Sequence, residues 1–293
     1  MSATTRPRKL QTSLQGEVVW ITGASSGLGE YLAYACAEQG ASLILSARQE
    51  EKLQKVRSRL RYPERAAVLP LDLEDHATLP AIVDAALALH GRVDRLVHNA
   101  AIAIRDFALD TTYEVDRKLM DVNYFGPVVL TKALLPHLLE RGRGHLVVVS
   151  SLSGKYGVPR TAAYAASKHA LHGFFETLRS EIAHRGIRIT VLVPGIIKTH
   201  ITAHALTGEG QTFGRMERTF QQAYPVEQAA QQMLKAILKE KEEAFIGGAE
   251  GYTLLLQRLS PWLLRRLIRN HPIKRLRRLK QRLALTRKPD ELA

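Results

Sequence analysis

The chain contains a single cysteine in 293 residues, Cys36, so it can form no disulfide within itself. The cysteine content gives no sign of an oxidising compartment, and we expect Cys36 to be a small buried side chain. No stretch approaches the roughly 18 apolar residues of a membrane-spanning helix. The bases near the N-terminus are followed by no apolar segment, so we expect neither a signal peptide nor an anchor in residues 1–16.

The sequence also lacks the motifs of several enzyme classes. Its 11 histidines show no H-E-x-x-H pair or other metal-ligand spacing, so we predict no metal site. A G-x-S-x-G nucleophile elbow and a Walker phosphate-binding loop are absent from the sequence as well. Hydrolase and phosphotransferase functions therefore lack their signatures.

The chain does show a regular alternation of apolar strands and helical patterns. Short apolar runs predict strands at residues 18–21, 42–47, 66–69, 95–98, 145–150, 187–193 and 244–246. Helical patterns lie at 28–39, 50–60, 75–90, 112–141 with an interruption at 126–127, 164–184 and 226–239. This alternation predicts an α/β fold, a doubly wound Rossmann-type parallel sheet with helices on both faces.

Three parts follow from composition along the chain. We predict a flexible N-terminus at 1–15, one Rossmann domain at 16–250 and a basic amphipathic helical extension at 251–293. Within the domain, the stretch at about 199–224 is polar, carries glycines and has no clear period. We interpret that stretch as a mobile flap over the site.

A glycine-rich turn lies between the first predicted strand and the first predicted helix. Glycine lets the backbone turn tightly and approach a pyrophosphate, whose charge meets the free N–H groups of the helix start. A glycine-rich stretch can also be a plain turn, but the strand-turn-helix context favours dinucleotide binding. The predicted contacts are Gly23, Ser25, Ser26, Gly27, Leu28 and Gly29.

The end of the second strand predicts which nicotinamide coenzyme binds. An acid there would accept from the ribose 2′-hydroxyl of NAD, but this strand ends Ser46-Ala47-Arg48. The Arg48 guanidinium can pair with the 2′-phosphate of NADP(H), although it can also be a surface arginine that opens a helix. Asp72, just past the third strand, is placed either to accept from the adenine amino group or to cap a helix.

A tyrosine and a lysine four residues apart suggest acid-base chemistry. Tyr164 and Lys168 fall on one face of a predicted helix, where the ammonium would lower the tyrosine pKa toward neutrality. Ser151, at the end of the preceding strand, can hydrogen-bond a substrate oxygen, and Asn123 can hold a water behind Lys168. A Y-x-x-x-K pair alone is common by chance, so its weight comes from the accompanying motifs.

Taken together, these motifs resemble the classical short-chain dehydrogenase/reductase family over about residues 17–247. The resemblance rests on the order and spacing of six motifs. They are Thr22-Gly-x-x-x-Gly-x-Gly29, Asn99-Ala100, Asn123, Ser151, Tyr164-x-x-x-Lys168 and Pro194-Gly195. The resemblance implies a catalytic tetrad of Asn123, Ser151, Tyr164 and Lys168. It also implies cofactor contacts from Asn99, Tyr164, Pro194, Ile197 and Thr199, and from Lys168 to the nicotinamide ribose. One departure is His98-Asn99-Ala100-Ala101, where the family has Asn-Asn-Ala-Gly.

Within the family, the chain resembles a membrane-associated subgroup that includes 11β-hydroxysteroid dehydrogenase type 1 and the dehydrogenase/reductase member-seven proteins. The segments that carry this resemblance are 45–48, 167–175 and the basic C-terminus. The resemblance implies an NADP(H)-dependent oxidoreductase for hydrophobic carbonyl/alcohol pairs such as steroids, retinoids or lipids. It also implies a homodimer or homotetramer. The alternative is a catalytically weak NADP(H)-binding regulatory or scaffolding protein on the same fold. We expect a cytoplasmic protein, with peripheral attachment to the cytoplasmic membrane face left open.

Most of the net charge of +14 lies in residues 258–288, which hold twelve bases and no Asp or Glu. Apolar residues recur at helical spacing among these bases, at Ile273, Leu276, Leu279 and Leu283. Three interpretations stay open, in this order: a helix on an anionic membrane surface, a tail packed on its own subunit, and a nucleic-acid contact. The third ranks lowest, and we expect no nucleic acid, because no recognised binding module accompanies the charge.

Overall fold

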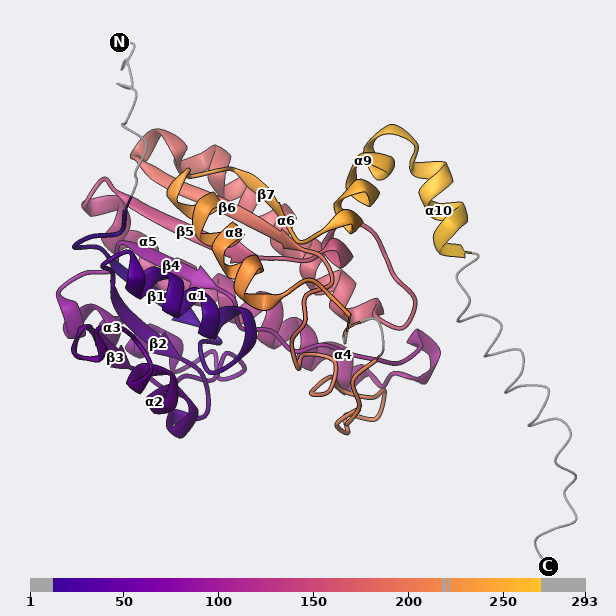
Figure 1. Cartoon of the computed structure of the whole chain (residues 1–293), viewed down its shortest axis with the longest axis horizontal. Coiled ribbons are helices and arrows are strands. Elements are labelled where there is room, and N and C mark those ends of the chain that lie inside the picture. The colour runs from indigo at the N-terminus through magenta and orange to yellow at the C-terminus, as the bar shows by residue number, and fades with distance from the viewer. Residues whose placement is uncertain (1–12, 218–219, 221, 270–293) are drawn as a thin grey trace, which may run out of the picture. The chain divides into compact units, whose positions relative to one another are not determined.

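The computed structural model describes residues 13–217, 220 and 222–269 and divides into two compact units (Figure 1). The first unit ends at Gly251 and the second begins at Tyr252. The first unit is built on one seven-stranded sheet in the order β3-β2-β1-β4-β5-β6-β7, with every pairing parallel. The strands are β1 (Val18–Thr22), β2 (Ser42–Ser46), β3 (Ala66–Val68), β4 (Arg95–His98), β5 (Gly144–Val149), β6 (Ile187–Pro194) and β7 (Glu243–Ile246).

Helices cover the sheet on both faces, which explains why its strands are so uniformly apolar. They are α1 (Gly27–Glu38), α2 (Glu50–Ser58), α3 (Leu79–His90), α4 (Tyr113–Met120), α5 (Gly126–Glu140), α6 (Ala162–Ile182) and α8 (Val226–Leu238). Every residue of β1, β4 and β5 is buried. Figure 1 shows α1 and α8 side by side, and both bury apolar side chains in one core with the strands. The doubly wound fold is therefore confirmed.

Two helices differ from the sequence expectation for local reasons. Helix α3 begins at Leu79 rather than Asp75, because the Thr78 hydroxyl donates to the Asp75 carbonyl (3.0 Å) and closes a turn there. The helix expected at 112–141 is divided by a π-helical turn, Asp121–Phe125, between α4 and α5. Cys36 is fully buried, as expected, and burial raises the pKa of its thiol to about 12.

The stretch predicted as a flap is partly paired in the described residues. Leu206 forms bridges to Ile104 and to Thr212, and Ile197 pairs with Tyr224. The first of these bridges brings the flap to the loop that follows β4. The flap is thereby attached to the carboxyl edge of the sheet, where the site residues lie.

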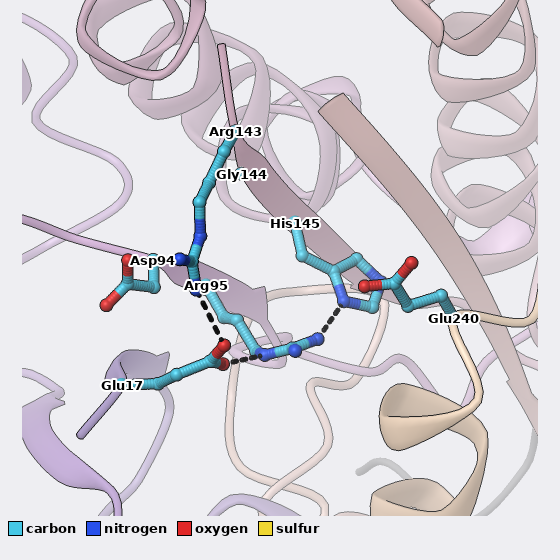
Figure 2. Close-up of a pocket in the computed structure, with 7 residues that line it drawn as sticks. All are labelled: Glu17, Asp94, Arg95, Arg143, Gly144, His145 and Glu240. Carbon is cyan, nitrogen blue, oxygen red and sulfur yellow. Dashed lines mark hydrogen bonds and ion pairs between the residues drawn. The ribbon is translucent and has the colours of Figure 1, made fainter. Parts of the chain in front are cut away.

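A buried ionic network lies at the opposite, amino edge of the sheet (Figure 2). Arg95, at the start of β4, pairs with Glu17 (Nε to Oε2, 2.5 Å), and both side chains are almost completely buried. Arg143 also pairs with Glu17 (3.0 Å), and the guanidinium of Arg95 contacts the His145 ring. The small pocket lined by these groups is far from the strand ends that carry Asn99 and Ser151, so we assign it a structural role.

The second unit contains α9 (Tyr252–Leu259) and α10 (Pro261–Arg269) in its described part. Helix α10 buries Leu264 and exposes Trp262 and Leu267. The stripe Ile273, Leu276, Leu279 and Leu283 lies outside the described residues. Among the helices that the structure does describe, none is both long and apolar enough to cross a membrane.

Candidate active site

The glycine turn joins the end of β1 to the start of α1 at the carboxyl edge of the sheet. Gly23 has a φ of 67°, and a Cβ there would lie 2.7 Å from the Ala100 Cα. A Cβ on Gly29 would lie 2.2 Å from the Gly23 carbonyl oxygen. Larger residues would therefore push the turn open. These glycines keep the backbone close to the helix start, where an anion is stabilised.

Asn99 and Thr22 lock this turn to the end of β4. The Asn99 side-chain amide donates to the carbonyls of Thr22 and Gly23, each at 3.1 Å. In return, the Thr22 hydroxyl accepts from the backbone N–H groups of Asn99 (3.1 Å) and Ala100 (3.2 Å). Asn99 thus lies beside the predicted cofactor path, where the resemblance places it, and fixes the shape of the turn.

The geometry of the turn fits a nicotinamide dinucleotide. Ser26 precedes α1 with an extended backbone and makes no side-chain capping bond, so its hydroxyl does not occupy the N–H groups at the helix start. Arg48 follows β2 and is exposed. Asp72 is not a helix cap, because Thr78 occupies that position of α3. The Asp72 carboxylate instead accepts from the Glu74 N–H (3.0 Å).

The segment after β6 returns to the same turn from a distant part of the sequence. Strand β6 ends at Pro194, and Ile197 beyond it is buried. The methyl group of Thr199 would lie 3.3 Å from a Cβ on Gly27. The structure therefore brings Thr199, from the segment after β6, alongside the glycine turn.

Tyr164 and Lys168 lie on one face of α6, with Ser151 opposite them at the end of β5. Ser151 begins the short 3₁₀ helix η4 (Leu152–Gly154), where its hydroxyl accepts from the Ser153 N–H (3.1 Å). It is also close enough to the Tyr164 phenol to lower the pKa of that group. The Lys168 ammonium donates to the Val149 carbonyl (2.8 Å) and lies 5.7 Å from the centre of the Tyr164 ring.

The electrostatics of this pair differ from the expectation. Burial raises the pKa of Tyr164, and the groups that oppose this rise are the Ser151 hydroxyl and the Arg105 guanidinium rather than Lys168. Burial also lowers the pKa of Lys168, to about 7. The prediction that Lys168 lowers the tyrosine pKa is therefore wrong for this structure. A buried tyrosine with a raised pKa keeps its proton at neutral pH and can donate it.

Asn123 lies in the π-helical turn, and its side chain is fully used by protein partners. Its amide nitrogen donates to the Ile102 carbonyl (2.9 Å) and to the Ser167 hydroxyl (3.1 Å). Its amide oxygen accepts from the Ile102 N–H (2.9 Å). The side chain thus clamps the loop after β4 to α6, and the water expected behind Lys168 stays a prediction.

The histidine that replaces a family asparagine is buried behind this site. His98 ends β4 and bonds the Thr131 hydroxyl through Nε2 (2.8 Å). Burial, with a smaller contribution from the Lys168 charge, lowers the pKa of His98 to about 3. The ring is therefore neutral at physiological pH, and it fills space without adding a charge beside Lys168.

Two groups near the site were missed from the sequence. His172, one turn beyond Lys168, bonds the Ser150 hydroxyl (2.9 Å) and lies within reach of Glu176 and Glu243. The Lys155 ammonium already pairs with Glu243 (2.5 Å), so we assign no metal there. Arg105 and Arg160 were also missed, because both lie on loops whose course no motif specifies.

Comparison with known proteins gives the family. A family model described as short chain dehydrogenase matches residues 17–210. A dehydrogenase/reductase SDR family protein 7-like of Drosophila melanogaster is 40% identical over 250 residues, 83% of this chain and 76% of the relative. The chain therefore belongs to the short-chain dehydrogenase/reductase family, and within it is similar to the member-seven proteins.

Solved structures agree with the fold. A short chain dehydrogenase/reductase from Burkholderia phymatum in complex with NAD has a TM-score of 0.75 at 24% identity, covering 86% of this chain and 96% of that one. A short chain dehydrogenase from Burkholderia cenocepacia in complex with NADP has a TM-score of 0.73 at 23% identity, covering 88% and 99%. Structures of this fold thus bind either dinucleotide.

Proposed function

We propose that this chain is an NADP(H)-dependent oxidoreductase for a hydrophobic carbonyl/alcohol pair, with Tyr164 as the acid-base group. The supporting observation is that Ser151 and the buried Lys168 ammonium both lie beside the Tyr164 phenol, at the sheet edge that carries the glycine turn. Tyr164 packs against a buried apolar cluster that includes Ile104, Val115 and Leu119, and Leu206 packs against the same cluster. These surroundings suit an apolar substrate.

The chemistry follows from these positions. The bound NADPH would supply a hydride to the carbonyl carbon, and Tyr164 would donate its phenolic proton to the carbonyl oxygen, which yields the alcohol. Ser151 would hold that oxygen by a hydrogen bond. Lys168, with a pKa of about 7, would return a proton to the phenolate and bind the nicotinamide ribose. Asn123 would keep the loop after β4 aligned with α6.

The preference for NADP(H) over NAD(H) rests on Arg48. The proposed dinucleotide contacts are Gly23, Ser25, Ser26, Gly27, Leu28, Gly29, Arg48, Asp72, Asn99, Pro194, Ile197 and Thr199. Arg48 is exposed just beyond β2, and residues 45–48 include no acid that would repel a 2′-phosphate. NADPH binding measured against NADH with purified protein tests this preference, and a preference for NADH would overturn it.

A second candidate is a catalytically weak NADP(H)-binding regulatory or scaffolding protein. A binding protein needs the glycine turn but has no need of Tyr164 and Lys168 together. A screen of steroid, retinoid and lipid carbonyls for NADPH oxidation separates the two functions. Turnover of any of these compounds supports the enzyme, whereas tight NADPH binding with no turnover supports the binding protein.

We also propose peripheral attachment to an anionic membrane through residues 258–288, and assembly into a homodimer or homotetramer. Exposed Trp262 and Leu267 on α10, with Arg266 stacked on the Trp262 ring (5.5 Å), support the membrane proposal. Attachment of this kind would place the enzyme on the cytoplasmic membrane face, close to apolar substrates.

A further inference from the structure

Two arginines converge beside Tyr164 from different loops. Arg105 follows β4, and its charge opposes the rise in the Tyr164 pKa, so the guanidinium lies within electrostatic range of the phenol. Arg160 precedes α6 and donates to the Arg105 carbonyl (2.8 Å). Its φ of 70° is a left-handed conformation that is costly for arginine, so surrounding contacts must hold it in place.

A single carboxylate from the flap bridges these arginines. Glu217 lies 3.3 Å from the Arg105 Nε and 3.4 Å from the Arg160 Nη1. Both distances exceed the roughly 2.7–2.9 Å of a good charge-assisted bond. The Arg105 Nε is buried and has no hydrogen-bond partner in the part of the chain that the structure describes. Glu217 therefore satisfies these donors only in part.

The charge and packing around the pair define what would fit better. Two guanidinium groups against one carboxylate leave an excess positive charge. Burial, together with the charge of Arg160, lowers the pKa of Arg105 against the opposing effect of Glu217. The neighbouring acid, Asp106, is already engaged by the backbone N–H groups of Phe107 and Gly208 (both 2.9 Å). Immediately beside them lies the apolar cluster that packs on Tyr164.

We propose that the substrate carries an anionic group, a carboxylate or a phosphate, that binds Arg105 and Arg160 while its carbonyl lies at Tyr164. Glu217 holds the place of that group and is displaced from the arginines when the substrate enters. The substrate class is then an amphipathic oxo compound with an anionic head and an apolar remainder. This inference rests on the proposed function, because Tyr164 defines where the carbonyl lies.

Binding of three probes that share one alkyl chain tests the inference without turnover. Decanoate, decyl phosphate and decanol are titrated calorimetrically into the full chain saturated with NADP⁺, which also occupies Arg48. We expect at least one anion to bind tenfold or more tightly than decanol. Whichever anion binds identifies a carboxylate or a phosphate, and both outcomes support the proposal.

Matched variants assign the effect to these residues. Glu217→Gln should tighten anion binding several-fold, because the competing carboxylate is gone, whereas Glu209→Gln on the same flap should change nothing. Arg105→Gln, or Arg160→Gln if the first misfolds, should remove the preference for anions, whereas Arg215→Gln should retain it. Decanol binding should be equal in all variants.

Two outcomes would overturn the inference. Anions that bind no better than decanol to both wild type and Glu217→Gln would show that the Arg–Glu–Arg bridge only fastens the flap. An equal gain in Glu209→Gln would show a nonspecific charge effect. Failure of the proposed function has a different signature. The chain would then fail to bind NADP⁺, or it would oxidise NADPH with neither 4-oxodecanoate nor the uncharged methyl ester of that compound.

Discussion

Replacing Lys168 with methionine should stabilise the folded chain while it abolishes turnover. Lys168 is 2% exposed, and burial lowers its pKa from 10.5 to about 7. Each pKa unit corresponds to about 1.4 kcal/mol, so below pH 7 the buried ammonium costs the folded state up to roughly 4–5 kcal/mol. Methionine removes this cost but also loses the hydrogen bond to the Val149 carbonyl, which is worth about 1–3 kcal/mol. The free energy of unfolding of Lys168→Met should therefore exceed that of the wild type by on the order of 2 kcal/mol.

The dependence on pH identifies the cause. The unfolded chain keeps the lysine proton up to about pH 10.5, whereas the folded chain releases it near pH 7. The wild type therefore gains stability relative to Lys168→Met as the pH rises between these values.

Thermal unfolding without coenzyme measures this difference. At about pH 6.5 we expect Lys168→Met to melt roughly 4–8 °C above wild type, and the gap to shrink at about pH 9.5. Lys235→Met, on the exposed face of α8, is the control and should show neither effect. A Lys168→Met variant less stable than wild type at pH 6.5, or a gap independent of pH, would refute the reasoning.

Four further predictions address other parts of the molecule. Arg48→Asp should weaken NADPH binding by losing a charge-assisted pair worth roughly 1.5–3 kcal/mol and should relatively improve NADH; unchanged affinities in fluorescence titration would contradict this. Arg95→Met should destabilise the fold by about 3 kcal/mol in urea unfolding, because it strips a buried partner from Glu17. Asn123→Ala loses three hydrogen bonds and should cost about 2–4 kcal/mol in the same assay; a loss below about 1 kcal/mol would argue against a clamp. Deleting residues 258–293 should release the protein from anionic vesicles at low salt, whereas full-length protein in the supernatant would exclude membrane attachment.

Much of the fold could be predicted because strand burial leaves a strong signal in the sequence. Strand β4 has the predicted bounds, 95–98. The observed bounds of the other strands differ from the predicted ones by no more than one residue at each end. Each strand is packed on both faces, so its apolar run begins and ends where the sheet does. The start of α3 was missed because a side-chain bond from Thr78, rather than a change in periodicity, sets it.

The site was predictable where chemistry depends on local spacing. Tyr164 and Lys168 share a helix face because they are four residues apart, and the glycine turn follows from its strand-turn-helix context. The convergence of Arg105 with Arg160 was not predictable, because it depends on a bridge between the flap and the loop after β4 and on a left-handed arginine. The reversed pKa shift of Tyr164 was missed for a related reason, since burial is a property of the packed structure.

The central proposal is that Tyr164 delivers the proton during reduction, and one comparison tests it most directly. NADPH binding and NADPH oxidation are measured for wild type and for Tyr164→Phe, which removes only the hydroxyl, with a carbonyl that the wild type reduces. We predict unchanged NADPH affinity and turnover lower by about 100-fold or more. Turnover by Tyr164→Phe at nearly the wild-type rate would contradict the proposal.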